Sequence, residues 1–510
     1  MAEKDFAKAI GEGYATDGAV IDLGRGVHDG ELVPEAVVQI PLAMMNRHGL
    51  IAGATGTGKT RTLQLLAEAL SAAGVPVFAA DVKGDLSGLA EPGEAGKAAE
   101  KRQGELGLPF APTGFPTEYL ALGGIGAGVP VRATVSDFGP QLLGKVLGAN
   151  QTQEQSLGLV FHYADGKGLP LVDLADLRAL LTFLDSDEGK PELEGIGGLS
   201  PATIGVLLRS LIGLEEGGGN ELFGEPQFAI ADLLRTAPDG RGVISCLELP
   251  GVQDKPKLFS TALMWMLAEL FEDLPEAGDL DKPKLVFFFD EAHLLFDDAT
   301  DAFLDSVAQT VRLIRSKGVG IFFVTQNPQD LPAEVLGQLG SRVQHALRAF
   351  TPDDAKALKA TVSTYPRSDF YDLGELLTQM GIGEAAVTVL SDRGVPTPVV
   401  HTRLAAPAAN MGPAADVDAA AKASPLFARY GERLDARSAS EILGERMAAP
   451  EPLPPTPMEH VPVPRRAPKE RAPKAPAPGG GVGDFLRSRE GQRVQRQVLR
   501  GMFGMLRKRL

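Results

Sequence analysis

Residues Gly49–Thr60 read GLIAGATGTGKT, and this stretch decides the fold of the chain. A short apolar strand candidate leads into a segment that matches the pattern G-x-x-x-x-G-K-[ST]. Glycines let the backbone curl so that its N–H groups converge on phosphate oxygens. Apolar residues at helical spacing follow over Thr60–Ala73, and Gly74 is placed as a glycine that ends a helix. The strand and the helix on either side favour a phosphate-binding loop over an ordinary glycine-rich turn.

The side chains of this loop have types that suit a nucleoside triphosphate. Lys59 can reach the terminal phosphates as a compact positive charge, and the Thr60 hydroxyl can ligate magnesium. The helix that follows presents the positive end of its dipole to the same anion. The residues predicted to bind the nucleotide are Thr55, Gly56, Thr57, Gly58, Lys59, Thr60 and Arg61.

A second element combines an apolar strand with two acids. Leu285–Phe289 is a run of apolar residues that ends in Asp290 and Glu291. The carboxyl ends of strands are where ligands bind in parallel sheets. On a strand that neighbours the loop, Asp290 would hold magnesium and Glu291 would act as the general base that polarises the attacking water. The alternative is an acidic surface turn. Glu291 also favours hydrolysis over phosphoryl transfer to a metabolite.

A third element ends another apolar strand. Ile321–Thr325 leads into Gln326, which would sense the γ-phosphate or orient the water, although a hydrogen-bonded turn residue is the common alternative. Asp81–Gly84 matches the D-x-x-G pattern of GTP switches, but the chain has no N-K-x-D element to read guanine. These patterns favour adenine, so the expected cofactors are ATP and Mg²⁺.

Apolar strands alternate with helices along much of the chain, which predicts an α/β fold with a parallel central sheet covered on both faces. An α-helical insertion interrupts this pattern. The predicted parts are an N-terminal segment (1–45), a first core part with the loop (46–139), the α-helical insertion (140–240), a second core part with the acids and the sensor (241–405), a helical extension (406–447), a proline-rich linker (448–483) and a basic amphipathic helix (484–510).

Charge is distributed unevenly over the 510 residues. The net charge is −16, and Val461–Leu510 holds thirteen basic and three acidic residues, so that segment carries +10 and the remainder −26. An acidic body repels a DNA duplex, so DNA would have to be held by local patches, a lined pore or the basic segment. One cysteine excludes an intramolecular disulfide framework. The sequence shows no signal peptide and no transmembrane segment, which predicts a cytoplasmic protein.

The C-terminal helix predicted over 484–510 has an apolar stripe flanked by arginines. Such a helix docks on a protein, lies on an anionic membrane or contacts phosphates. Docking on protein, either this chain or a neighbour, is the favoured interpretation, and the proline-rich segment before it would give it reach.

The loop, the strand that ends in Asp290 and Glu291, and the segment Arg315–Gln326 together resemble the HerA/FtsK superfamily of ring-forming, DNA-pumping ATPases. Two longer strings, Asn46–Lys59 and Leu336–Phe350, resemble its bacterial YjgR-type HerA-like branch, whose function is uncharacterised. The resemblance implies a RecA-like P-loop NTPase fold, a homo-oligomer expected as a hexameric ring, and a DNA translocase or helicase-like activity. The alternative is a nucleotide-gated assembly or scaffold ATPase that acts on a protein partner without DNA.

The resemblance also implies a role for Arg315, which comes just before the sensor strand. In this superfamily an arginine at that place reaches the site of the neighbouring subunit as an arginine finger, where it neutralises charge on the transferred phosphoryl group. The alternative is a cation that faces the dipole at a helix C-terminus. One departure concerns the N-terminus, since the DNA-end-processing members usually carry a β-barrel for which residues 1–45 are too short.

Overall fold

The computed structural model describes residues 3–94, 96–193, 195–278, 280–296 and 301–448. The chain divides into two units, Met1–Ser440 and Glu441–Leu510, and of the second unit only residues 441–448 are described. The predicted basic helix (484–510) and all but the first residue of the predicted linker (448–483) therefore lie outside the described residues.

One sheet of twelve strands runs through the first unit, in the order β2-β1-β12-β11-β10-β3-β9-β8-β4-β7-β5-β6. The strands are β1 (Val20–His28), β2 (Glu31–Pro41), β3 (Gly49–Ala52), β4 (Val77–Asp81), β5 (Thr117–Leu122), β6 (Val129–Val131), β7 (Ile244–Glu248), β8 (Leu285–Phe289), β9 (Val319–Thr325), β10 (Ser341–Gln344), β11 (Glu384–Thr388) and β12 (Val400–Leu404). From β10 to β6 all neighbours are parallel, which confirms the predicted parallel core. From β10 to β2 the neighbours are antiparallel.

Sixteen α-helices accompany the sheet within the described residues. They are α1 (Glu3–Gly13), α2 (Lys59–Ala72), α3 (Lys97–Glu105), α4 (Val135–Val146), α5 (Gln151–Lys167), α6 (Leu174–Asp185), α7 (Pro201–Leu214), α8 (Asn220–Leu222), α9 (Pro256–Asp273), α10 (Asp301–Ile314), α11 (Ala333–Leu336), α12 (Pro352–Ser363), α13 (Leu373–Gln379), α14 (Val417–Lys422), α15 (Pro425–Tyr430) and α16 (Ala439–Ala448). In the part of the chain that is described, no helix has both the length and the apolar character that a membrane span requires.

Helices cover the two faces of the parallel core. Side chains alternate between the faces of a strand, and on β8 Phe288 belongs to the same hydrophobic cluster as Leu63 of α2. Its neighbour Phe289 instead lines a small apolar cavity together with Met264 of α9 and Val307 of α10. All five residues of β8 are buried, as expected for a central parallel strand that reads as a continuous apolar run.

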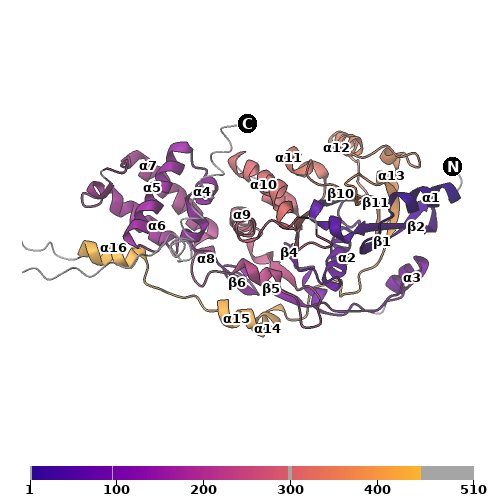
Figure 1. Ribbon diagram of the computed structural model, residues 1–510, viewed down its shortest axis with the longest axis horizontal. Coiled ribbons are helices and arrows are strands. Elements are labelled where there is room, and N and C mark those ends of the chain that lie inside the picture. Colours follow the sequence, from indigo (N-terminus) through magenta and orange to yellow (C-terminus); the bar gives the residue numbers. More distant parts are fainter. Residues whose placement is uncertain (1–2, 95, 194, 279, 297–300, 449–510) are drawn as a thin grey trace, which may run out of the picture. The chain divides into compact units, whose positions relative to one another are not determined.

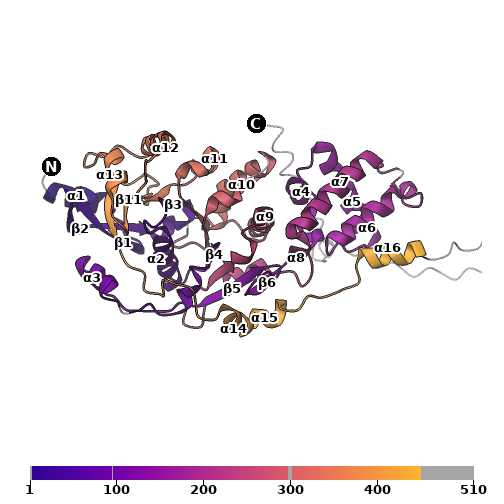
Figure 2. The same ribbon diagram turned by 180° about the vertical axis from the view of Figure 1, so that it is seen from behind.

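The helices α4 to α8 form the helical insertion and lie together in both views (Figures 1 and 2). Local capping explains several of their starts. Asn150 and Gln153 form a capping box at the start of α5, and Asp173 and Asp176 form another at the start of α6. The first of these helices, α4, contacts α9 and α10 of the core. It begins at Val135, which is five residues before the boundary expected from the sequence.

Candidate nucleotide-binding site

The loop after β3 has the curled backbone that its glycines suggested. Gly53, Gly56 and Gly58 have φ angles of +155°, +79° and +117°, in the range that residues with a side chain rarely adopt. A Cβ atom on Gly53 would lie 2.5 Å from the Cβ of His345. Gly58 is the N-cap of α2, so the loop leads directly into the positive end of a helix dipole.

Neighbouring strands hold the loop in place through its backbone. The Gly53 N–H donates to the carbonyl of Thr325 at the end of β9 (3.3 Å), and the Ala54 N–H donates to the carbonyl of Ala346 after β10 (2.9 Å). Within the loop, the Thr57 hydroxyl donates to the Ala54 carbonyl (2.7 Å). The loop is therefore anchored on both sides of β3.

Lys59 lies within electrostatic reach of the two predicted acids. It is buried, and its Nζ donates to the carbonyls of Gly53 (2.7 Å) and Ala54 (3.3 Å). Burial lowers the pKa of Lys59, while the negative charges of Glu291 and Asp290 act in the opposite direction. The structure thus brings together the lysine and the acids that were predicted to form the site.

Asp290 follows β8 directly and is only 2% exposed. Burial, and next the charge of Glu291, raises the pKa of Asp290 to about 6. Glu291 is also buried, and its φ of +46° is unusual for a residue with a side chain. Its Oε1 forms an ion pair with Nζ of Lys83, and its Oε2 lies 3.5 Å from Nδ1 of His293. Burial opposes ionisation, but the hydrogen bond and the charge of Lys83, with weaker contributions from Lys59 and His293, together outweigh it and lower the pKa of Glu291.

The expectation that the acids lie on a strand next to the loop was wrong. β9 lies between β3 and β8, with Phe323 of β9 opposite Leu50 of β3 on one side and Phe289 of β8 on the other. Two apolar strands of similar composition cannot be ordered across a sheet from the sequence alone. The order found here places Gln326, which follows β9, between the loop and the acids along the same edge of the sheet.

Asp330 organises the turn after β9, and the sequence reasoning missed it. Gln326 itself is exposed, whereas Thr325 is buried and its hydroxyl donates to Oδ2 of Asp330 (2.6 Å). The Asn327 N–H donates to the same oxygen (2.9 Å). Asp330 also acts to raise the pKa of Lys59, though less strongly than Glu291 or Asp290. The signal was available as a capping box, because Asn327 and Asp330 have the N-x-x-D spacing.

The other predicted nucleotide ligands lie around the start of α2. Thr55 and Gly56 are exposed, Thr57 is buried, and Thr60 is half-buried. The guanidinium of Arg61 donates to Oε1 of Gln64 on the same helix (2.8 Å). Burial lowers the pKa of Arg61, and the charge of Asp85 opposes this shift.

Two acids outside the prediction lie on the same edge of the sheet. Asp81 ends β4 and accepts hydrogen bonds from the N–H groups of Gly84 (2.8 Å) and Leu86 (2.6 Å). Asp81–Gly84, which matched the GTP-switch pattern, is therefore a turn capped by a carboxylate. It places Lys83 in contact with Glu291. Glu248 ends the next strand, β7, and burial together with the charge of Asp81 raises the pKa of Glu248 to about 8.

Arg315 is not brought to the loop of its own chain. It is exposed and begins the short turn Arg315–Lys317 before β9, whereas Gln326 follows the other end of that strand. Seven residues of strand span about 23 Å at ~3.3 Å per residue. Burial lowers the pKa of His48 to about 4, and the positive charge of Arg315 contributes to this shift. Arg315 therefore lies near the amino end of β3, at the edge of the sheet opposite the loop.

The strand order, the loop and the acids define a RecA-like phosphate-loop fold. The sequence profile of the family described as Helicase HerA-like C-terminal matches residues 28–509. This chain belongs to that family, and the predicted membership of the HerA/FtsK superfamily is confirmed. The YjgR-type branch stays a prediction.

Solved structures with a similar fold include two of the bacterial conjugative coupling protein TrwB. The unbound form has a TM-score of 0.50 and 14% identity over 79% of this chain and 91% of that one. The complex with the non-hydrolysable GTP analogue GDPNP has a TM-score of 0.50 and 16% identity over 76% and 95%. VirB4 of Thermoanaerobacter pseudethanolicus has a TM-score of 0.48 and 17% identity over 76% of this chain and 97% of that one. At these identities the similarity to TrwB establishes the fold alone. No curated protein matches the chain.

Proposed function

We propose that this protein binds ATP with magnesium and hydrolyses it as the motor subunit of a HerA-like assembly. One observation carries the proposal. Lys59, at the start of α2, is buried and interacts electrostatically with Asp290 and Glu291 at the same edge of the sheet. A lysine in a curled amide loop facing two carboxylates is the arrangement that phosphate-loop hydrolases use.

The residues present fit a magnesium ion. Among the described residues, no three acidic, histidine or cysteine side chains are grouped so that they could hold a metal by themselves. Magnesium in nucleotide sites is held by one or two carboxylates together with the substrate phosphates. Thr60 and Asp290 would supply the protein ligands, and a nearby cation would favour the ionised form of an acid whose pKa burial has raised. The ion would neutralise charge on the β- and γ-phosphates.

Hydrolysis follows from the roles of these side chains. A water molecule attacks the γ-phosphorus while the bond to the bridging oxygen of ADP breaks. Glu291 accepts the proton of that water, and Gln326 orients the water from the strand between the loop and the acids. Lys59 balances the charge on the terminal phosphates. Glu291 suits the role of base because its ion pair with Lys83 keeps its pKa low, so it is ionised at neutral pH.

The finer proposal is a hexameric ring that translocates on DNA, with Arg315 completing the site of a neighbouring subunit. The position of Arg315 supports it, since this exposed residue lies at the edge of the sheet opposite its own loop. A second copy could therefore receive it. The cytoplasm stays the predicted location.

The second candidate is an ATPase that acts on a protein partner without DNA. The charge of −26 outside Val461–Leu510 favours this candidate, because such a body repels a polyanion. The C-terminal helix predicted over 484–510 would then be the partner-binding segment.

Rates of ATP hydrolysis with and without double-stranded and single-stranded DNA, together with the mass in solution, test both candidates. Stimulation by DNA that disappears at high salt, in a multimer, supports the translocase. Turnover that DNA leaves unchanged supports the protein-directed ATPase. Turnover that survives in Lys59→Ala would overturn the assignment of the site itself.

A further inference from the structure

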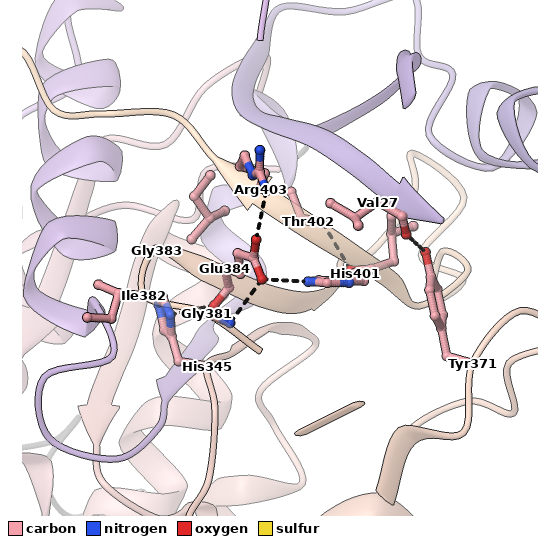
Figure 3. A network of polar contacts seen from close by, with 12 residues as sticks. Val27, His345, Tyr371, Gly381, Ile382, Gly383, Glu384, His401, Thr402 and Arg403 are labelled. Atoms are coloured by element: carbon pink, nitrogen blue, oxygen red, sulfur yellow. Dashed lines mark hydrogen bonds and ion pairs between the residues drawn. The ribbon is translucent and has the colours of Figure 1, made fainter. Parts of the chain in front are cut away.

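An apolar side chain stands beside the phosphate loop, on the turn Gly381–Gly383 before β11. The Gly383 N–H donates to the Thr57 carbonyl (3.0 Å). A Cβ atom on Gly58 would lie 3.3 Å from the Gly383 nitrogen, so the turn directly contacts the loop. At its tip, Ile382 is 75% exposed. Figure 3 shows its side chain pointing away from the Glu384 carboxylate.

Hydrogen bonds with two side chains hold the backbone of this turn. Arg102 of α3 donates to the carbonyls of Gly383 (3.0 Å) and Ile382 (3.2 Å). Oε2 of Glu384 accepts from the Gly381 N–H (3.0 Å). One set of bonds comes from the distant helix α3 and the other from the first residue of β11, and together they fix both ends of the turn.

Glu384 is in turn fixed by the next strand, as Figure 3 shows. Its carboxylate pairs with Nε2 of His401 (3.0 Å) and with a guanidinium nitrogen of Arg403 (3.3 Å). The bond from His401 comes first among the causes that lower the pKa of Glu384 to about 2. The buried ring of His345 joins this turn to the helix of the loop, because its Nδ1 contacts the Glu384 carbonyl (2.9 Å) and its Nε2 contacts the Thr62 hydroxyl (2.8 Å). Ile382 is therefore an exposed apolar group on a rigid support.

The sheet order indicates on which side of the loop a nucleoside would lie. The acids Asp290 and Glu291 follow β8, which is separated from β3 by β9. On the other side of β3 come β10 and then β11, which Ile382 precedes. If the terminal phosphates of ATP lie between Lys59 and the acids, as the proposed function requires, the remainder of the molecule would extend away from β8. That direction leads toward β10, β11 and the turn.

We propose that Ile382 is the residue that contacts the base of bound ATP, with its side chain packed on the flat face of the purine. The inference rests on the proposed function and deepens it. The contact would remove apolar surface of both groups from water, while the hydrogen bonds of the turn keep the side chain in place. Triphosphate recognition would remain with the loop, and Ile382 would add affinity for the nucleoside.

Calorimetric titration of the full-length chain tests this division of roles. Mg²⁺–ATP and Mg²⁺–tripolyphosphate are titrated into wild type, Ile382→Ala and Val395→Ala. Val395 is the matched control, because it is an aliphatic residue that is 59% exposed in the turn at the other end of the β11–β12 hairpin. We expect Ile382→Ala to bind ATP about five- to tenfold more weakly and tripolyphosphate as wild type does. Val395→Ala should match wild type with both ligands, and Ile382→Leu should restore most of the ATP affinity.

Unchanged ATP affinity in Ile382→Ala overturns the inference, and so does an equal loss of tripolyphosphate affinity, which would mean that the residue only shapes the loop. The proposed function fails in a different way. A wild-type chain that binds neither ligand removes the nucleotide site, and the base contact with it. A wild-type chain that binds and hydrolyses ATP, with an unaffected Ile382→Ala variant, refutes the base contact alone.

Discussion

Lys83 and Glu291 form an ion pair between the turn that follows β4 and the acid pair that follows β8. The lysine side chain is 45% exposed, whereas that of the glutamate is 7% exposed, so the pair reaches from solvent into the site. Asp81 holds the turn that carries Lys83 by accepting backbone hydrogen bonds. This relationship gives the proposed base both its position and its charge.

Removal of Lys83 should make the ATPase more sensitive to acid. In Lys83→Ala the buried Glu291 would lose its main cation and keep only the weaker effects of Lys59 and His293, so the pKa of Glu291 rises. Glu291 would then be protonated at higher pH than in wild type. In a plot of kcat against pH, the acid limb should therefore shift to higher pH. Lys83→Arg keeps the charge and is the control, with a limb close to that of wild type. A profile that does not move in Lys83→Ala would show that the ion pair leaves the base unaffected.

Glu291→Gln should separate binding from turnover. The amide keeps the size of the side chain but cannot accept the proton of the attacking water, so kcat should fall by about 10²- to 10⁴-fold while ATP still binds. Phosphate release and a fluorescent nucleotide titration measure the two properties. Glu334→Gln changes an exposed acid on α11 and is the control, which should alter neither turnover nor ATP binding. Turnover near the wild-type rate in Glu291→Gln would remove this residue from the mechanism.

The loop and the acids could be predicted because their signals are local. In Gly49–Thr60 the glycines, the lysine and the start of the helix are consecutive, and the acids end a run of apolar residues. The order of the strands is not local, so β9 between β3 and β8 was not foreseen. Lys83 meets Glu291 across 208 residues of sequence, and no spacing rule connects them.

The antiparallel part of the sheet was hard to predict from the sequence for a different reason. Residues 1–45 gave few signals, yet they form α1, β1 and β2. Gly24 and Gly26 interrupt the apolar pattern of β1, and the structure explains the first of them. A Cβ atom on Gly24 would lie 2.0 Å from the carbonyl oxygen of Arg403 on β12, so only glycine permits this approach. A glycine that serves a contact almost 380 positions away reads as a loop residue in the sequence.

The raised pKa of Glu248 should make the stability of the chain depend on pH. Burial, and next the charge of Asp81, raises the pKa of Glu248 to about 8 from an ordinary value of 4.5. Between these values the folded chain binds a proton that the unfolded chain releases, so the free energy of unfolding falls as pH rises. The contribution of Glu248 should therefore lower Tm between pH 5 and pH 9, and over this range Glu248→Gln should lose about 2 °C less Tm, or gain about 2 °C more, than wild type. The exposed Glu334→Gln is the control. An identical dependence of Tm on pH in wild type and Glu248→Gln would show that folding does not raise the pKa of this carboxyl.

Arg315 should act on a neighbouring subunit if the chain forms a ring. It lies at the edge of the sheet opposite its own loop, so it would meet the phosphates of an adjacent copy. Arg315→Ala should lower kcat by about 10³-fold or more, the effect of removing an arginine finger. Its mixture with the inactive Glu291→Gln should regain activity, because some sites then combine an intact base with an intact finger.

Arg312, which is exposed one helical turn earlier on α10, supplies the matched control for this experiment. Arg312→Ala should retain wild-type turnover, since loss of a nearby surface charge alone should not impair the site. Equilibrium mass measurements on each variant would establish that the subunits still assemble, so that a loss of activity reports on the site rather than on the ring. If the mixed assemblies stay as inactive as their parents, Arg315 supports its own chain, for example at the end of α10, and the finger must be sought elsewhere.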